Sequence, residues 1–136
     1  MSFNWRFCLK VGVLVALVDL ATLGLAQLRP SDELRALLDL LNLIVNVMLF
    51  SHVGFRTGLE TGRATTAAEA GVVTSLLPAL AAALYPVLLP AWIDPASAEI
   101  PLYRQIVSVI AWNIVIGGLS ALLSGFLASR GRTPVR

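Results

Sequence analysis

Two long stretches without a charged residue constrain this chain more than any other feature. They run from Ala70 to Ile93 and from Gln105 to Ser129. About 20 apolar residues, each rising about 1.5 Å in a helix, cross the hydrocarbon core of a bilayer, and both stretches exceed that length. A core helix of a soluble protein does not need so long an apolar run. We therefore predict that both stretches are transmembrane helices.

Two further apolar segments precede them, from Phe7 to Leu28 and from Leu34 to Phe55. Their only Lys, Arg, Asp or Glu residues are Lys10, Asp19, Arg35 and Asp39. The composition agrees, because 57% of the residues are hydrophobic, 13% are charged and the mean hydropathy is +0.83. A soluble domain carries far more charge. We predict an all-α integral membrane four-helix bundle, a single transmembrane domain over residues 1–136 with helices at 5–28, 32–54, 66–92 and 101–129.

The connection between the second and third helices has the composition of a loop. Gly58 and Gly62 lie within the segment 56–65, together with charged residues, which predicts a polar loop at the membrane face. Thr66 and Glu69 then have the spacing of a capping box, in which the hydroxyl accepts from the third amide and the carboxylate reaches back. This predicts that the third helix begins at Thr66.

Basic residues near the helix ends predict the orientation in the membrane. One side collects Arg6, Lys10, Arg56, Arg63, Arg130, Arg132 and Arg136, and the other collects only Arg29, Arg35 and Arg104. Because cytoplasmic loops carry the excess of Lys and Arg, both termini are expected in the cytoplasm. The expected location is a bacterial inner membrane. Basic residues placed in this way serve topology, so we expect no nucleic-acid partner.

Small residues at four-residue spacing form the packing signal of the later helices. Such residues allow close backbone approach in lipid, where the hydrophobic drive for helix association is weak. The third helix carries Gly71, Ser75 and Ala79, and the fourth carries Gly117, Ala121 and Gly125. These two helices are expected to pack together, although alanine-rich segments also produce such stripes by chance. The first helix has a weaker version in Gly12, Ala16 and Gly24.

Polar residues inside the predicted spans are the candidates for function. Asp19 lies in the first helix, Asn42 and Asn46 share a face of the second, and Asn113 belongs to the fourth. Their depths predict one polar cluster, and a membrane aspartate must be protonated, hydrated or partnered. The cluster is either a proton or cation site, or a set of structural interhelical hydrogen bonds. The structural interpretation is simpler, because one carboxylate without a buried base offers no proton relay.

Metal and catalytic chemistry have little support in the sequence. Cys8 is the only cysteine, which excludes an internal disulfide and a zinc site built on paired cysteines. His52 is the only histidine, and it is either a haem or pigment ligand or, more simply, a hydrogen-bonding residue at the membrane interface. No catalytic motif is present, so we expect no enzyme, and the sequence names no cofactor.

Two functional hypotheses follow. The leading one is a non-catalytic subunit that packs within a larger membrane complex of an energy-transducing or transport type. Its partners would be membrane lipids and other integral membrane subunits or a second copy of itself. The alternative is a small homo-oligomeric transporter or channel, coupled to ions or protons through Asp19. Flux that depends on Asp19 distinguishes the second from the first.

Overall fold

The chain folds into four α-helices, seen in a computed structural model that describes residues 4–28, 31–88 and 101–131. The helices are α1 (Trp5–Ala26), α2 (Asp32–Thr61), α3 (Ala64–Leu88) and α4 (Leu102–Arg130). All four are long and apolar enough to cross a membrane. The predicted all-α fold with four candidate spans is therefore confirmed, and the chain is a four-span membrane protein.

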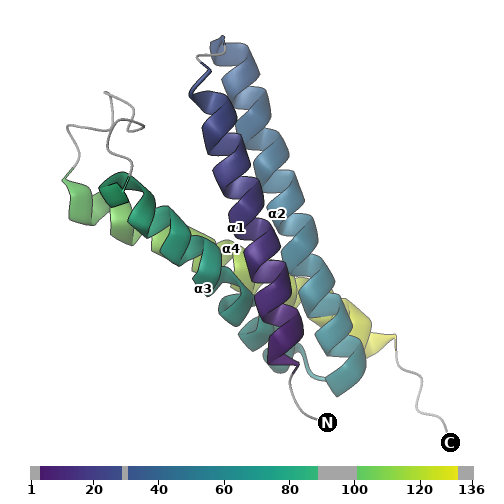
Figure 1. Cartoon of the computed structure of the whole chain (residues 1–136). Helices are drawn as coiled ribbons and strands as arrows, with labels where there is room; N and C mark the ends of the chain where they lie inside the picture. The colour runs from purple at the N-terminus through teal and green to yellow at the C-terminus, as the bar shows by residue number, and fades with distance from the viewer. Residues whose placement is uncertain (1–3, 29–30, 89–100, 132–136) are drawn as a thin grey trace, which may run out of the picture.

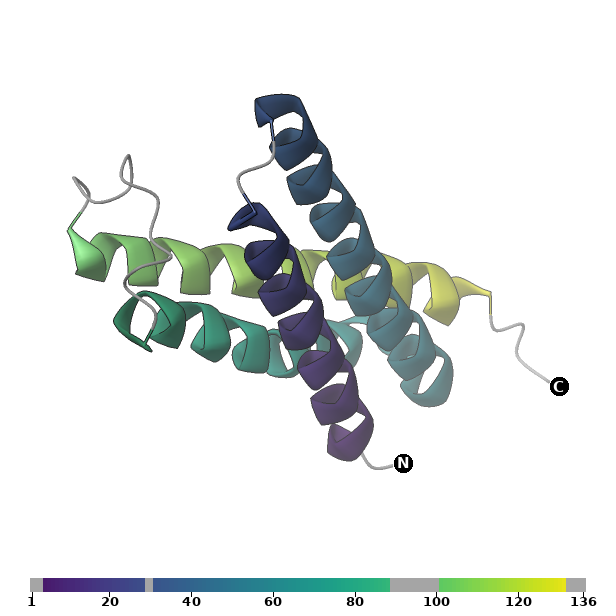
Figure 2. The ribbon, with the colours of Figure 1, turned by 45° about the horizontal axis from the view of Figure 1, so that its top comes forward.

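The helices form two antiparallel hairpins that cross each other (Figure 1). One hairpin consists of α1 and α2 and the other of α3 and α4, and Figure 2 shows the crossing from a second side. The first residues of α1, the turn between α2 and α3 and the end of α4 lie at one end of the molecule, where the hairpins meet. The contacts between α3 and α4 are the most extensive, followed by those between α2 and α4, whereas α1 and α4 are not neighbours over their described lengths. Toward the other end, the hairpins diverge.

Side chains cap the first turns of the first two helices. The Asn4 side chain accepts a hydrogen bond from the amide of Phe7 at 3.2 Å, and the Ser31 hydroxyl accepts one from the amide of Leu34 at 3.4 Å. First-turn amides have no partner within their own helix, so these side chains supply it. The starts of α1 and α2 are thereby fixed by single polar residues.

The predicted loop over 56–65 is wrong, because α2 continues through most of it to Thr61 instead of ending at residue 54. Gly62 follows in the left-handed conformation, with φ of 70°, and α3 begins at Ala64. A glycine adopts this conformation without the steric cost that a side chain would add, so it ends the helix and turns the chain. The connection between α2 and α3 is thus a tight turn.

Local contacts explain why α2 remains helical there. Arg56 and Glu60 form an ion pair one turn apart, with 3.0 Å between Nε and Oε1, on the exposed face. The Thr61 hydroxyl donates to the carbonyl oxygen of Thr57 at 2.8 Å. Gly58, which was expected in the loop, is buried against α4. Tertiary packing therefore overrides the weak helix propensity of glycine.

The remaining boundaries differ by smaller amounts. The capping box at Thr66 is wrong, because the amide of Ala67 already donates to the carbonyl oxygen of Arg63 at 3.3 Å and the helix begins at Ala64. Helix α1 ends at Ala26 rather than at residue 28, and α4 covers Leu102–Arg130 rather than 101–129. The last part of the predicted helix 66–92, residues 89–92, lies outside the described residues.

A seam of small residues joins α2, α3 and α4 at the end where the hairpins meet. We call this set the glycine seam; its members are Gly54, Gly58, Ala67, Gly71, Ser75, Gly117, Ala121 and Gly125. Between α3 and α4, a Cβ atom added to Gly71 would collide with the carbonyl oxygen of Gly117. One added to Gly117 would lie 2.8 Å from the Cβ of Ser75. The backbones of the two helices are therefore in direct contact, as small residues permit in lipid.

Helix α2 also packs against α4 in this seam. A Cβ added to Gly58 would lie 2.6 Å from the carbonyl oxygen of Gly125, and one added to Gly54 would collide with the backbone of Ala121. Gly125 in turn lies directly against Ala67 of α3. Helix α4 thus packs closely against both α2 and α3, which explains why its glycines lie in the seam.

The other small residues of the predicted stripes lie apart from this seam. Ala79 is buried in α3. In α1, a Cβ on Gly12 would lie 2.7 Å from the carbonyl oxygen of Thr74, so α1 packs closely on α3 at this point. A Cβ on Gly24 would meet no atom of the described chain within 4 Å apart from its own stretch of helix. The stripe of α1 is therefore a packing face at Gly12 and not at Gly24.

The outward surfaces of the helices are apolar. Large side chains such as Leu123 and Leu127 of α4 are 64% and 68% exposed, and exposed leucines also cover α1 and α2. A soluble protein would not tolerate so much exposed apolar surface, whereas lipid tails cover it at no cost. These surfaces are in contact with membrane lipid.

Candidate functional site

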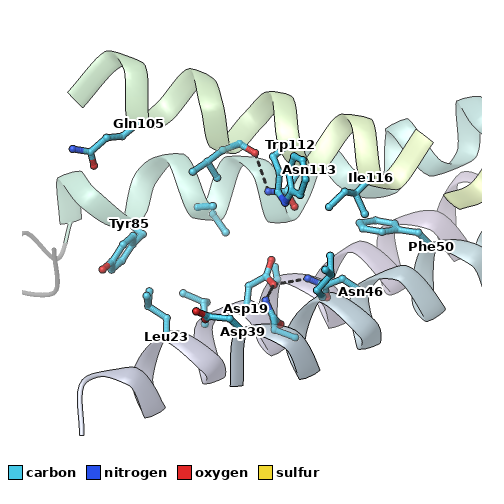
Figure 3. Close-up of a pocket in the computed structure, with 17 residues that line it drawn as sticks. Asp19, Leu23, Asp39, Asn46, Phe50, Tyr85, Gln105, Trp112, Asn113 and Ile116 are labelled. Carbon is cyan, nitrogen blue, oxygen red and sulfur yellow. Dashed lines mark hydrogen bonds between the residues drawn. The ribbon is translucent and has the colours of Figure 1, made fainter. Parts of the chain in front are cut away.

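Asp19 accepts hydrogen bonds from two asparagines of the neighbouring helix. The distances from Asp19 Oδ1 are 2.9 Å to Nδ2 of Asn42 and 2.7 Å to Nδ2 of Asn46. The two asparagines lie one turn apart on α2, so both side chains face α1 at neighbouring levels. Two amide donors thus converge on a single carboxylate oxygen, as the dashed lines in Figure 3 show.

The same geometry leaves two amide oxygens without a partner. Because each amide turns its nitrogen to the carboxylate, its oxygen points elsewhere. Oδ1 of Asn42 and Oδ1 of Asn46 are both buried, and neither has a hydrogen-bond partner among the described residues. A buried unsatisfied acceptor costs about 1–3 kcal/mol. The cluster is therefore rich in hydrogen-bond acceptors and short of donors.

Asp19 and its partners line a cavity of about 480 Å³ between the two hairpins. All four helices contribute to it, and its volume falls within the range of small-molecule sites, about 300–1,000 Å³. In Figure 3, Asp19 lies across the cavity from Trp112 of α4. Phe50 lies toward one end of the cavity and Tyr85 toward the other. The cavity lies where the hairpins begin to diverge. The glycine seam adjoins it on the side where the hairpins meet.

The charges in the cavity wall are all of one sign. Asp19 and Asp39 line it, and none of the 17 described side chains of the wall belongs to Lys, Arg or His. An aspartate at the centre of a membrane helix costs about 2.5–3.5 kcal/mol on insertion scales. A cavity lined by one sign of charge and walled by apolar groups attracts ions of the opposite sign. The cavity is thus suited to a cation and disfavours an anion.

Asn113 lines the same cavity but bonds within its own helix. Its Nδ2 donates to the carbonyl oxygen of Val109 at 3.0 Å, one turn earlier in α4. Short polar side chains often bond to the preceding turn in this way. The described structure thus gives Asp19 two asparagine donors from α2, while Asn113 contributes a polar group to the facing wall.

The sequence predicted the lining of this cavity only in part. Asp39 shares the polar stripe of Asn42 and Asn46 at intervals of three or four residues, but it was expected to pair with Arg35 one turn earlier and was not assigned to the cluster around Asp19. The aromatic residues Tyr85 and Trp112 carry no such signal. They belong to helices of the other hairpin, and only the crossing of the hairpins brings them to Asp19.

His52 lies outside the cavity, on the exposed side of α2. Its ring meets that of Phe7 edge to face, with 5.8 Å between the centroids. The guanidinium of Arg56 lies over the same Phe7 ring, 4.4 Å from its centroid. The histidine therefore belongs to an aromatic and cationic cluster that joins the start of α1 to α2.

The chemistry available to the cavity is recognition by charge and hydrogen bonding. Its carboxylates attract a cation and accept hydrogen bonds, and its apolar walls offer contact to an apolar group. Comparison with known proteins gave no match among protein-family models, curated protein sequences or solved structures.

Proposed function

We propose that this protein is a small membrane transporter or channel that binds a monovalent cation or proton at Asp19. The observation that carries the proposal is the position of Asp19, held by Asn42 and Asn46 in the wall of a cavity between the hairpins. Purely structural hydrogen bonds between α1 and α2 would not require a cavity beside them. Ionisable groups within membrane spans commonly mark the path of an ion or substrate.

Flux through proteoliposomes tests the proposal. Purified protein is reconstituted, a pH gradient or a sodium gradient is imposed together with a membrane potential, and the movement of each ion is measured. We expect cation-dependent flux from the wild type and at least a tenfold loss in Asp19→Asn. Glu33→Gln is the matched control, because it removes the same charge from an exposed residue at the start of α2.

Folding is compared in the same preparations by helicity and by size-exclusion profile. Normal folding of Asp19→Asn with lost flux supports the proposal. If the wild type moved neither protons nor sodium, or if Asp19→Asn moved them equally well, the proposed function would be wrong.

A second candidate is the non-catalytic subunit of a larger membrane complex. What favours it is the divergence of the hairpins, since α1 and α4 are not neighbours in the part of the chain described. Native mass measurement of a gentle detergent extract tests it. Co-purifying chains of other sequence support this candidate, and a free chain or a homo-oligomer alone contradicts it.

A further inference from the structure

We propose that the cavity binds a primary ammonium compound with an apolar body, such as an alkylamine. The inference rests on the proposed function and names the class of cation that Asp19 would take. The ammonium group would lie at Asp19, which Asn42 and Asn46 hold in place, and the apolar body would extend along the cavity between the hairpins. Three properties of the cavity support this chemistry.

The first property is the hydrogen-bonding character of Asp19. Its carboxylate lines the cavity, accepts hydrogen bonds only, and is held by Nδ2 of Asn42 and of Asn46. A primary ammonium group carries three N–H donors and one positive charge on a compact head, as the lysine side chain does. One of these donors would bond to the carboxylate of Asp19. A quaternary ammonium carries no N–H donor and could not form this hydrogen bond.

The second property is the charge of the wall. Asp19 and Asp39 both line the cavity, and its described lining holds no basic side chain to receive an anionic group. The carboxylate of an amino acid would therefore face like charge without a counter-ion. A simple amine fits this field, whereas a zwitterion of the same length does not.

The third property is the apolar character of the remaining surface. Leu20 and Leu43 also line the cavity. Phe50 lies toward one end of it, and the rings of Tyr85 and Trp112 belong to the facing hairpin. Sites of this kind use a few placed polar groups for orientation and an apolar lining for most of the contact. Aromatic faces also attract ammonium groups. A hydrated metal ion would make no use of this surface, and an alkyl or aryl chain would.

A series of hexyl compounds tests the proposal on the full chain in nanodiscs, with every residue of the cavity wall unaltered. The four ligands are hexylammonium, hexanol, hexyltrimethylammonium and 6-aminohexanoate, all near pH 7, where the amine is protonated. Binding is read from the fluorescence of Trp112 after Trp5→Phe and Trp92→Phe, which leaves a single reporter in the cavity wall. We expect saturable binding of hexylammonium and at least tenfold weaker binding of the other three.

Variants locate the ammonium group. Asp19→Asn is expected to weaken hexylammonium binding at least tenfold, and Asn46→Leu to weaken it several-fold. Glu33→Gln, which removes a charge outside the cavity, is expected to leave the binding unchanged. Because the ligand series uses the unaltered polar cluster, the proposal stays testable even if a variant at Asp19 fails to fold.

The outcomes separate this inference from the proposed function. Equal binding of hexyltrimethylammonium, or unchanged binding in folded Asp19→Asn, would overturn the ammonium site. Absence of hexylammonium binding together with Asp19-dependent flux of protons or sodium would overturn the inference and leave the proposed function standing. Absence of both would overturn both.

Discussion

Replacing Gly58 with alanine tests whether this residue is packed in α2, as the structure shows, or lies in a surface loop, as the sequence suggested. A residue in a surface loop tolerates an added methyl group, whereas Gly58 lies in α2 against the backbone of α4. A Cβ at this position would lie 2.6 Å from the carbonyl oxygen and 2.8 Å from the Cα of Gly125. Carbon atoms in contact are about 3.5–4.0 Å apart, so α2 and α4 would have to separate by about 0.7 Å or more.

The size of the effect follows from the atoms involved. Both close contacts are backbone atoms, which cannot rotate away, so the separation spreads along the glycine seam. Overpacking of this kind costs about 1–3 kcal/mol. The higher helix propensity of alanine returns about 0.5–1 kcal/mol. We expect a net loss of about 1–2 kcal/mol in the free energy of unfolding, roughly a five- to thirtyfold change in the unfolding equilibrium.

Gly24→Ala is the matched control, because a Cβ added there meets no atom of the described chain beyond its own local helix within 4 Å. It should leave the free energy of unfolding unchanged or raise it by up to about 1 kcal/mol. Unfolding in mixed micelles with increasing SDS, followed by helicity, measures both variants against the wild type. If Gly58→Ala were as stable as Gly24→Ala, the packing of α2 on α4 would be wrong.

Three further predictions concern the other contacts. Gly117→Leu, Gly125→Leu and Gly58→Leu should each lower thermal stability in detergent strongly. If these variants were as stable as Gly24→Leu, the close packing of helices at the glycine seam would be wrong. Asn46→Leu removes a 2.7 Å hydrogen bond between α1 and α2 and should lower the free energy of unfolding by about 1–2 kcal/mol in the same SDS assay. Asn113→Leu should cost less, because the hydrogen bond of Asn113 is within α4. The reverse order of the two variants would contradict the pairing of Asn46 with Asp19. With Cys8→Ser as background, Ser97→Cys should react with an impermeant thiol reagent from outside, while Thr61→Cys and Thr133→Cys should react only after the membrane is opened. Ser97 and Thr133 lie outside the described residues, and external labelling of Thr133→Cys would invert the predicted topology.

Hydropathy made the four helices predictable from the sequence, because each must satisfy its backbone internally across the bilayer. The boundary of α2 was not predictable in this way. Gly58 and Gly62 look alike in the sequence, yet Gly58 is helical and packed, and Gly62 ends the helix at φ 70°. Gly54 and Gly58 form a G-x-x-x-G motif, a packing signal that the loop interpretation of the segment overlooked.

In the candidate site, too, contacts between neighbouring helices were predictable from the sequence, and those that depend on distant segments were not. Helix periodicity and depth were sufficient to associate Asp19 with Asn42 and Asn46, since consecutive helices of a hairpin are neighbours. The depth of Asn113 was also predicted from the sequence, but its hydrogen bond was not, because the side chain bonds to the carbonyl oxygen of Val109 in the preceding turn of its own helix. The cavity depends on how the two hairpins cross, and no short segment of sequence contains that angle.

The central claim is that ions or solutes reach Asp19 through the cavity between the hairpins, and blocking the cavity tests it most directly. Ala82 of α3 lines the cavity, while Ala111 of α4 is exposed and lies outside its lining. Proteoliposome flux is measured for Ala82→Phe and for Ala111→Phe, with helicity and thermal stability checked for both. The account predicts that a folded Ala82→Phe loses at least nine-tenths of the Asp19-dependent flux, whereas Ala111→Phe retains it. Equal flux through both variants would contradict the account.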